Sequence, residues 1–144
     1  MAAPADQDVA AAQRELREAV QVGEALQGEL QNIEEQLGYL RALTQEYQRA
    51  RATLEALKPL KRGEEVLLPI GGGNFVRASL ADADKVISGI GAGVSVEGSI
   101  EAALARVDQQ LDAARQASQR LQEEGQRVAG ELQQIEDRLG QMTG

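Results

Sequence analysis

Two glycine-rich segments are the part of this chain whose residue types and spacing most resemble a binding motif. Gly71, Gly72 and Gly73 form one segment, and residues 89–93 form the other with the sequence GIGAG. Glycine-rich loops hold phosphate groups when G-x-G-x-x-G joins a strand to a helix, or when a glycine-lysine pair followed by serine or threonine ends the loop. Neither pattern is present, since Val94 takes the place of the third glycine. We therefore predict hairpin turns, which glycine favours, and no nucleotide site.

Asp82 and Asp84 are a second candidate, because carboxylate oxygens are the ligands that Mg²⁺ prefers. Only these two carboxylates lie close together in this stretch, and Lys85 follows them directly. We predict a solvated turn between two strands, with no metal bound.

The composition removes most enzyme classes. The chain has no His and no Cys, which excludes zinc sites, disulfides and nucleophiles activated by histidine. Its 23 acidic and 15 basic side chains are mixed along the sequence, so no basic stripe is available for nucleic acid or an anionic membrane. The longest apolar runs, such as residues 66–70, fall well below the ~20 residues of a membrane span. We expect a cytoplasmic protein that is not an enzyme and needs no cofactor.

The composition changes twice along the chain and predicts three segments. Residues 1–58 and 99–144 are rich in Ala, Leu, Glu, Gln and Arg, which favour helix. Residues 59–98 begin at Pro59 and turn to Val, Ile and Gly. The expected order is helix, β region, helix, and the three segments together form one domain.

Both helical segments carry apolar residues at alternating steps of three and four, which is typical of a coiled coil over about six heptads. An intrachain antiparallel hairpin of helices is favoured over a parallel dimer of each helix, because the two helices have similar lengths and flank one compact insertion. Two registers fit. Paired residue numbers that sum to 158 place Gly23 opposite Ile135 and Ile33 opposite Gly125, whereas a sum of 151 places Gly23 opposite Val128. We favour 158, because large residues then meet small ones along the seam.

The β region contains four strand signals that form two hairpins. We predict strands at residues 66–70, 75–80, 85–90 and 93–97, joined by turns at 71–74 and 91–92. A lone two-stranded hairpin is marginally stable in water, and its free edges can pair with other chains. We therefore expect copies or relatives of this chain to complete the sheet.

Two segments carry a resemblance to a known family. Residues 66–76 read VLLPIGGGNFV and residues 85–97 read KVISGIGAGVSVE, and in this order and spacing they closely resemble the alpha-type subunit of the prefoldin family. The resemblance covers nearly the whole chain and implies an alpha-type subunit of the archaeal kind. In this resemblance the chain has two hairpins, where the beta-type subunit has a single hairpin. The expected fold is α+β: a long antiparallel coiled-coil helical hairpin with two β-hairpins inserted, which assemble into an intersubunit β-barrel body.

The resemblance also implies a function. It implies a hetero-hexamer with beta-type prefoldin subunits, two alpha and four beta, that captures unfolded client proteins at its coiled-coil tips without ATP and passes them to a group II chaperonin. A non-catalytic coiled-coil scaffold or stalk subunit is the alternative, and suppression of aggregation distinguishes the two. An enzyme is a distant third reading.

Candidate residues follow from the hydrophobic pattern and from the resemblance together. For the client-binding tip we name apolar residues near the free helix ends: Val9, Leu16, Val20, Val22, Ile135, Leu139 and Met142. For the oligomer interface we name the apolar residues of the predicted hairpins: Val66, Leu68, Ile70, Phe75, Val76, Leu80, Val86, Ile87, Ile90, Val94 and Val96.

Overall fold

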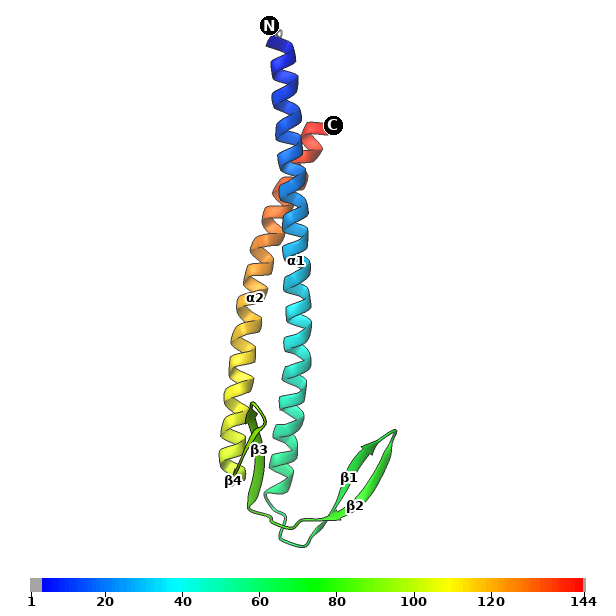
Figure 1. The fold of residues 1–144 in the computed structure, drawn as a ribbon, viewed down its shortest axis with the longest axis vertical. Helices are drawn as coiled ribbons and strands as arrows, with labels where there is room; N and C mark the ends of the chain where they lie inside the picture. The colour runs from blue at the N-terminus through cyan, green and yellow to red at the C-terminus, as the bar shows by residue number, and fades with distance from the viewer. Residues whose placement is uncertain (1–3, 144) are drawn as a thin grey trace. The chain divides into compact units, whose positions relative to one another are not determined.

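The computed structural model describes residues 4–143 of the chain, and Figure 1 shows their fold. Two long helices flank two separate antiparallel hairpins, as the sequence predicted. The elements follow one another as α1 (Pro4–Leu57), β1 (Glu65–Gly71), β2 (Asn74–Ser79), β3 (Lys85–Gly91), β4 (Val94–Ser99) and α2 (Ile100–Thr143).

The chain divides into two compact bodies. The terminal body combines Met1–Ala42 with Gln116–Gly144, and the hairpin body is Leu43–Arg115. Each helix contributes residues to both bodies, and both hairpins belong to the hairpin body. We describe each body by itself.

The helix ends follow local chemistry. Helix α1 begins at Pro4, because the fixed φ of proline suits the first helical position. It ends at Leu57, since Pro59 disfavours helix at the residue before it. Helix α2 begins at Ile100 after Ser99, whose Oγ accepts a hydrogen bond from the backbone N–H of Ala102 at 3.0 Å. Ser99 is therefore the N-cap that separates β4 from α2.

In the terminal body the two helices pack antiparallel along an apolar seam. Leu26, Ile33 and Val128 form its buried centre, with Val128 fully inaccessible. A Cβ placed on Gly125 would lie 3.4 Å from Cγ2 of Ile33. This contact confirms the register in which paired residue numbers sum to 158, and a sum of 151 does not fit.

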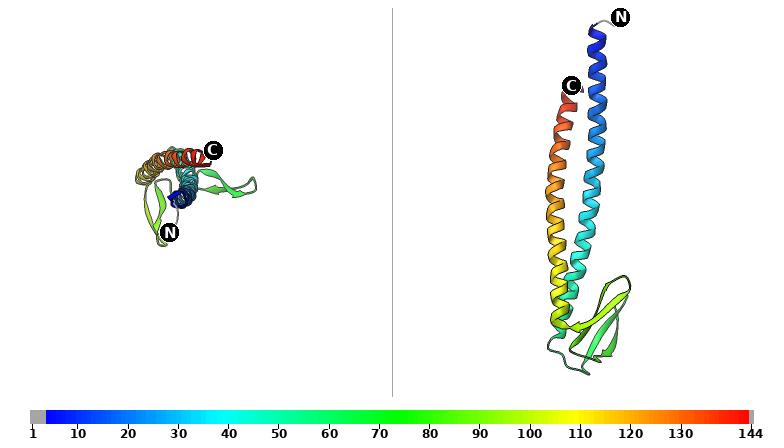
Figure 2. Two further views of the ribbon diagram at one scale, coloured as in Figure 1. Left: turned by 90° about the horizontal axis from the view of Figure 1, so that it is seen from above. Right: turned by 60° about the vertical axis from the view of Figure 1, so that its left-hand side comes forward.

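In the hairpin body a second buried cluster joins the end of α1 to the start of α2. It consists of Leu54 from α1 with Ile100, Ala103 and Leu104 from α2, and Val86 of β3 packs against it. The right-hand view of Figure 2 shows the two helices side by side here. One face of the second hairpin is thereby anchored on the helices.

The two hairpins have the same pattern of strand pairing. Leu67 is the Cα partner of Arg77 in β1–β2, and Ile87 is the partner of Glu97 in β3–β4. Each ladder has an irregularity just before its turn, between Pro69 and Gly71 in β1 and between Gly89 and Gly91 in β3. Such bulges strengthen the local twist of a strand.

The turns are shorter than or displaced from those predicted. Gly71 pairs with Asn74, so only Gly72 and Gly73 form the first turn, and the second turn consists of Ala92 and Gly93 rather than residues 91–92. All four turn residues have positive φ, as a hairpin turn that matches strand twist requires. The predicted strand bounds were therefore wrong at several ends, and Leu80 lies outside β2.

Candidate functional site

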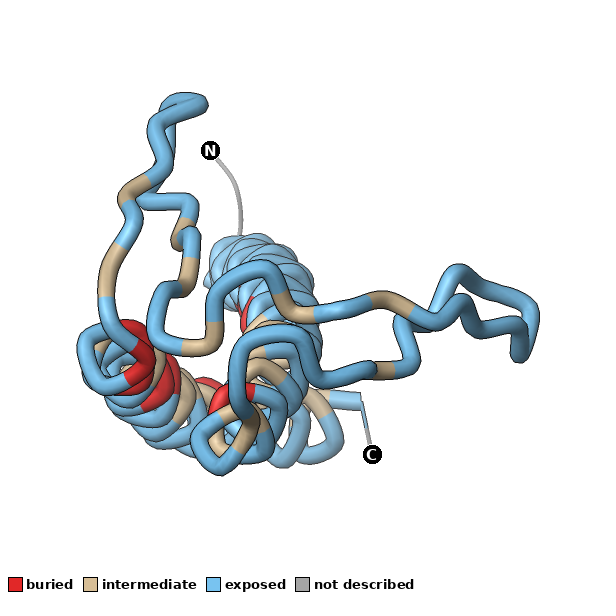
Figure 3. The backbone as a smooth tube through the Cα atoms, turned by 90° about the horizontal axis from the view of Figure 1, so that it is seen from below, coloured by how far each residue is buried: buried red, intermediate tan, exposed pale blue. Residues whose placement is uncertain are grey.

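The first hairpin, β1–β2, exposes apolar side chains on both of its faces. Leu67 and Leu68 are neighbours on β1 and point to opposite faces, yet their exposed fractions are 65% and 51%. Figure 3 shows this hairpin as exposed along nearly its whole length. The other exposed apolar residues of this hairpin are Ile70, Phe75 and Val76. Leu67 was not among the predicted interface residues.

The second hairpin, β3–β4, combines exposed apolar side chains with one that packs on the helices. Ile87 is 74% exposed, and Ile90 and Val94 are also exposed. Val86 and Val96 are half-buried, and Val86 packs on the helix cluster. A groove of about 610 Å³ lies between β3 and the two helices. Val86, a predicted interface residue, therefore supports the fold of its own chain.

Both hairpins also leave backbone hydrogen-bonding groups available. Each sheet has two strands only, β1–β2 and β3–β4, so both strands of each pair are edge strands. An edge strand offers a row of N–H and C=O groups to any further strand. Exposed apolar area and open edges occur on the same two elements, which makes the hairpins the candidate assembly surface.

The predicted tip residues differ in how accessible they are. Val9, Val20 and Val22 are exposed, with exposed fractions of 56%, 41% and 47%. The other four residues are half-buried, because they belong to the seam of the terminal body: Leu16, Ile135, Leu139 and Met142. Thr143, the last described residue of α2, would pair with Glu15 in the 158 register, so none of the described residues of α2 lies opposite residues 4–14 of α1. Figures 1 and 2 show this overhang.

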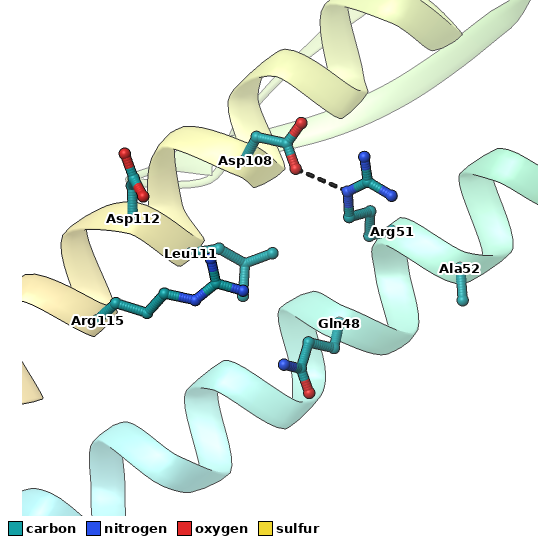
Figure 4. A pocket seen from close by; sticks show the side chains of 7 residues that line it. All are labelled: Gln48, Arg51, Ala52, Asp108, Leu111, Asp112 and Arg115. Atoms are coloured by element: carbon teal, nitrogen blue, oxygen red, sulfur yellow. Dashed lines mark hydrogen bonds and ion pairs between the residues drawn. The ribbon is translucent and has the colours of Figure 1, made fainter.

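A polar contact between the helices was not anticipated from the sequence. Arg51 occupies a seam position of α1, and its Nε donates a 2.8 Å hydrogen bond to Oδ1 of Asp108 on α2. Figure 4 shows the pair at the edge of a pocket of about 490 Å³. The hydrogen bond and charge of Asp108, with a smaller contribution from Glu55, raise the pKa of Arg51. The 158 register could have indicated this contact. In that register Val107 lies opposite Arg51, and Asp108 is the next residue of α2.

The segment between the hairpins is a turn, as predicted. The backbone N–H of Asp84 donates a 3.0 Å hydrogen bond to Oδ1 of Asp82, which is the Asx turn that aspartate commonly forms. Within residues 4–143, no group of three or more carboxylates is arranged to hold a metal ion. In the same part of the chain, no helix carries an apolar stretch that could cross a membrane.

Comparison with known proteins decides the family. A family model described as prefoldin subunit matches residues 26–143, which include most of both helices and both hairpins. The chain belongs to the prefoldin family.

Individual prefoldin subunits agree with this assignment. Prefoldin subunit alpha of Methanopyrus kandleri is 47% identical over 77 residues, which cover 51% of this chain and 49% of the relative. That match spans about half of the length of the relative. Prefoldin subunit alpha of Pyrococcus horikoshii is 30% identical over 131 residues, covering 90% of this chain and 84% of the relative.

A solved prefoldin structure has the same fold. The chain superposes on a subunit of the cryo-EM structure of filamentous PFD from Methanocaldococcus jannaschii with a TM-score of 0.68 and 23% identity. The match covers 80% of this chain and 95% of that one. Prefoldin subunits are chaperone subunits that assemble with other prefoldin subunits, and both hairpins of this prefoldin carry exposed apolar side chains.

Proposed function

We propose that this prefoldin subunit acts as an ATP-independent holdase, which binds unfolded proteins at its helix ends and releases them to a group II chaperonin. The observation that carries the proposal is that each body has its own exposed apolar side chains: the hairpins in one body and the valines of α1 in the other. Burial of apolar surface drives both subunit association and the capture of unfolded chains. We place this activity in the cytoplasm.

The hairpins are the proposed assembly surface. Two isolated two-stranded sheets with exposed Leu, Ile, Val and Phe side chains gain stability when further strands cover them. The proposed product is a hexamer of two copies of this chain and four beta-type subunits, with the hairpins joined in a β-barrel body. Native mass spectrometry of the chain with a co-expressed beta-type subunit tests this composition, and a complex of different stoichiometry would contradict it.

The overhang of α1 is the proposed client-binding tip. Val9 and the flanking residues Val20 and Val22 have exposed side chains, and a helix end frays at small cost because its last turns lack backbone partners. Half-buried Leu16, Ile135, Leu139 and Met142 become accessible when the end opens. Met142 suits varied clients, because its flexible side chain repacks easily.

Aggregation of a guanidinium-denatured enzyme such as citrate synthase, diluted into buffer without ATP, tests the function. A holdase keeps the diluted enzyme soluble at near-stoichiometric amounts, and later addition of a group II chaperonin with ATP recovers its activity. A structural scaffold subunit leaves the aggregation unchanged, which would overturn the proposal. Protection without recovery on adding the chaperonin would retain the holdase and reject the transfer step.

A further inference from the structure

The negative charge of the chain is concentrated in the terminal body. Of the 23 acidic side chains, 13 lie in this body, but only 6 of the 15 basic side chains do, which leaves it with a formal charge of −7. The hairpin body has the other 10 acidic and 9 basic side chains and is nearly neutral, at −1. The body in which we propose client binding is therefore the one that attracts positively charged molecules.

Each exposed valine of α1 has an acidic side chain one helical turn away. Residues three or four apart in sequence are neighbours on the surface of a helix. Three pairs have this spacing, and we call them the valine–acid pairs: Val9 with Asp6, Val20 with Glu24, and Val22 with Glu18. All six side chains are exposed. One basic residue, Arg17, has the same spacing from Val20, so carboxylates outnumber cations beside these valines.

The carboxylates of the valine–acid pairs form no ion pair within residues 4–143. The ion pairs of the terminal body both involve Arg127 of α2, whose guanidinium lies 3.0 Å from Glu131 and 3.9 Å from Glu124. A cationic group of another molecule therefore meets carboxylates on α1 that no ion pair of this chain has already neutralised.

The valine–acid pairs are accessible to another chain. Val9 keeps the seven-residue spacing of the seam with Leu16, but none of the described residues of α2 lies opposite it in the 158 register. Val20 and Val22 flank the seam on its two sides and are 41% and 47% exposed. An unfolded segment can thus reach a valine–acid pair from either side of the helix.

We propose that the valine–acid pairs select unfolded segments that combine apolar residues with Lys or Arg, and reject equally apolar segments that carry Asp or Glu. The inference rests on the proposed holdase function and adds the chemical class of its clients. Apolar contact with the valines provides affinity for any unfolded chain, and the carboxylates attract cations and repel anions. Lys and Arg suit both parts of a pair, because their apolar stems pack on the valine while their charged ends reach the carboxylate.

Three labelled peptides with the same apolar residues test the inference. Their interspersed polar positions are all Lys, all Gln or all Glu, and fluorescence anisotropy with the full chain measures each dissociation constant. We expect the Lys peptide to bind most tightly and the Glu peptide most weakly, and added salt to reduce the difference, because salt screens exposed charges. Equal affinity for the three peptides at low salt would overturn the inference but leave the holdase proposal supported. Binding of none of them would reject both.

A variant without the three carboxylates locates the preference. Asp6→Asn, Glu18→Gln and Glu24→Gln together should raise the dissociation constant of the Lys peptide about 3- to 30-fold, because three favourable charge contacts are lost. The dissociation constant of the Gln peptide should stay within about twofold of the wild-type value, since the valines are unchanged. An unchanged affinity for the Lys peptide would exclude these carboxylates.

The matched control removes the same charge elsewhere in the terminal body. Glu29→Gln, Glu34→Gln and Glu123→Gln change exposed residues that have no exposed valine one turn away, so the affinity for the Lys peptide should be retained. An equal loss in the control would assign the preference to the total charge of the body and overturn the role of the valine–acid pairs.

Replacement of the three valines by Ser tests the apolar part of each pair. The triple variant should bind both the Lys and the Gln peptides more weakly. Undiminished binding of the Lys peptide would show that the carboxylates act without the valines, which would contradict the inference. Circular dichroism verifies that every variant retains its helices.

Discussion

Gly23 of α1 lies directly opposite Ile135 of α2, where a Cβ on Gly23 would be 3.4 Å from Cγ2 of Ile135. The relationship repeats in the opposite sense at Ile33 and Gly125. A glycine on either helix therefore makes room for an isoleucine on the other. Each of these two helical glycines thus lies against an isoleucine of the other helix.

Replacement of Gly23 by Ala is expected to stabilise the fold by about 0.5–1 kcal/mol, because Ala favours helix more than Gly does. The new methyl group reaches Ile135 at an ordinary contact distance. Chemical denaturation followed by circular dichroism measures the change. Gly28→Ala is the control, since no atom lies within 4 Å of a Cβ at that position. Gly23→Leu should instead overpack the seam and destabilise by about 1–3 kcal/mol; a neutral result would argue against the close approach.

The Arg51–Asp108 pair should contribute modestly to stability. Its side chains are 46% and 50% exposed, so a double-mutant cycle with Arg51→Ala and Asp108→Ala is expected to give a small favourable coupling free energy that salt reduces further. The pKa of Arg51 is raised on folding. Its stabilising effect is thus fully present below the unfolded pKa and is lost only as pH rises through the folded value. The contribution of Arg51 should stay constant from neutral pH to about pH 10, and a decline within that range would contradict this.

Ile87 and Val86 are neighbours with different expected roles. Ile87→Asp places a charge on an exposed position, so we expect the monomer to keep its unfolding free energy while the oligomer dissociates. Val86→Ala removes packing against the helix cluster and should lower the unfolding free energy by about 1 kcal/mol. Denaturation and native mass spectrometry measure the two effects. If the Ile87→Asp variant keeps its oligomer intact, β3–β4 is not part of the interface.

Ala92 is the one non-glycine residue with positive φ among the described residues, at 52°. This conformation costs an L-residue about 1–2 kcal/mol, although glycine loses more entropy on folding. Ala92→Gly is therefore expected to stabilise the hairpin slightly, by less than about 1 kcal/mol. Gly93→Ala should destabilise it, since Gly93 has a φ of 74°. Thermal unfolding measures the stability of the two variants. If both substitutions changed stability equally and in the same direction, the positive φ of these two turn residues would be contradicted.

The exposed valines of α1 can be tested without disturbing the hairpins. A triple replacement of Val9, Val20 and Val22 by Ser should weaken aggregation suppression several-fold while the assembled mass stays unchanged, because apolar contact with clients is lost. Replacement of three exposed polar residues of α2 by Ser, Gln119, Gln126 and Gln133, serves as the control. Full protection by an assembly whose beta-type subunits also lack exposed tip residues would place client binding elsewhere.

The sequence alone determined much of this protein. Alternating three- and four-residue spacing predicted both helices, and the exchange of large and small residues predicted the 158 register that the contact of Gly125 with Ile33 confirms. Pro59 located the end of α1 to within one residue. These features are local or periodic, so they can be derived from residue types and spacing alone.

Tertiary structure decided what periodicity could not. The alternation of the β region is the same for Val86 and for Val66, yet only Val86 packs on the cluster of Leu54 and Ile100. Which hairpin face meets a helix depends on the path of the chain between elements, which no strand pattern contains. The Arg51–Asp108 contact likewise required the lateral position of one helix against the other. A sequence records which side chains are apolar or charged, whereas only the packed chain determines which of them its own fold has already covered.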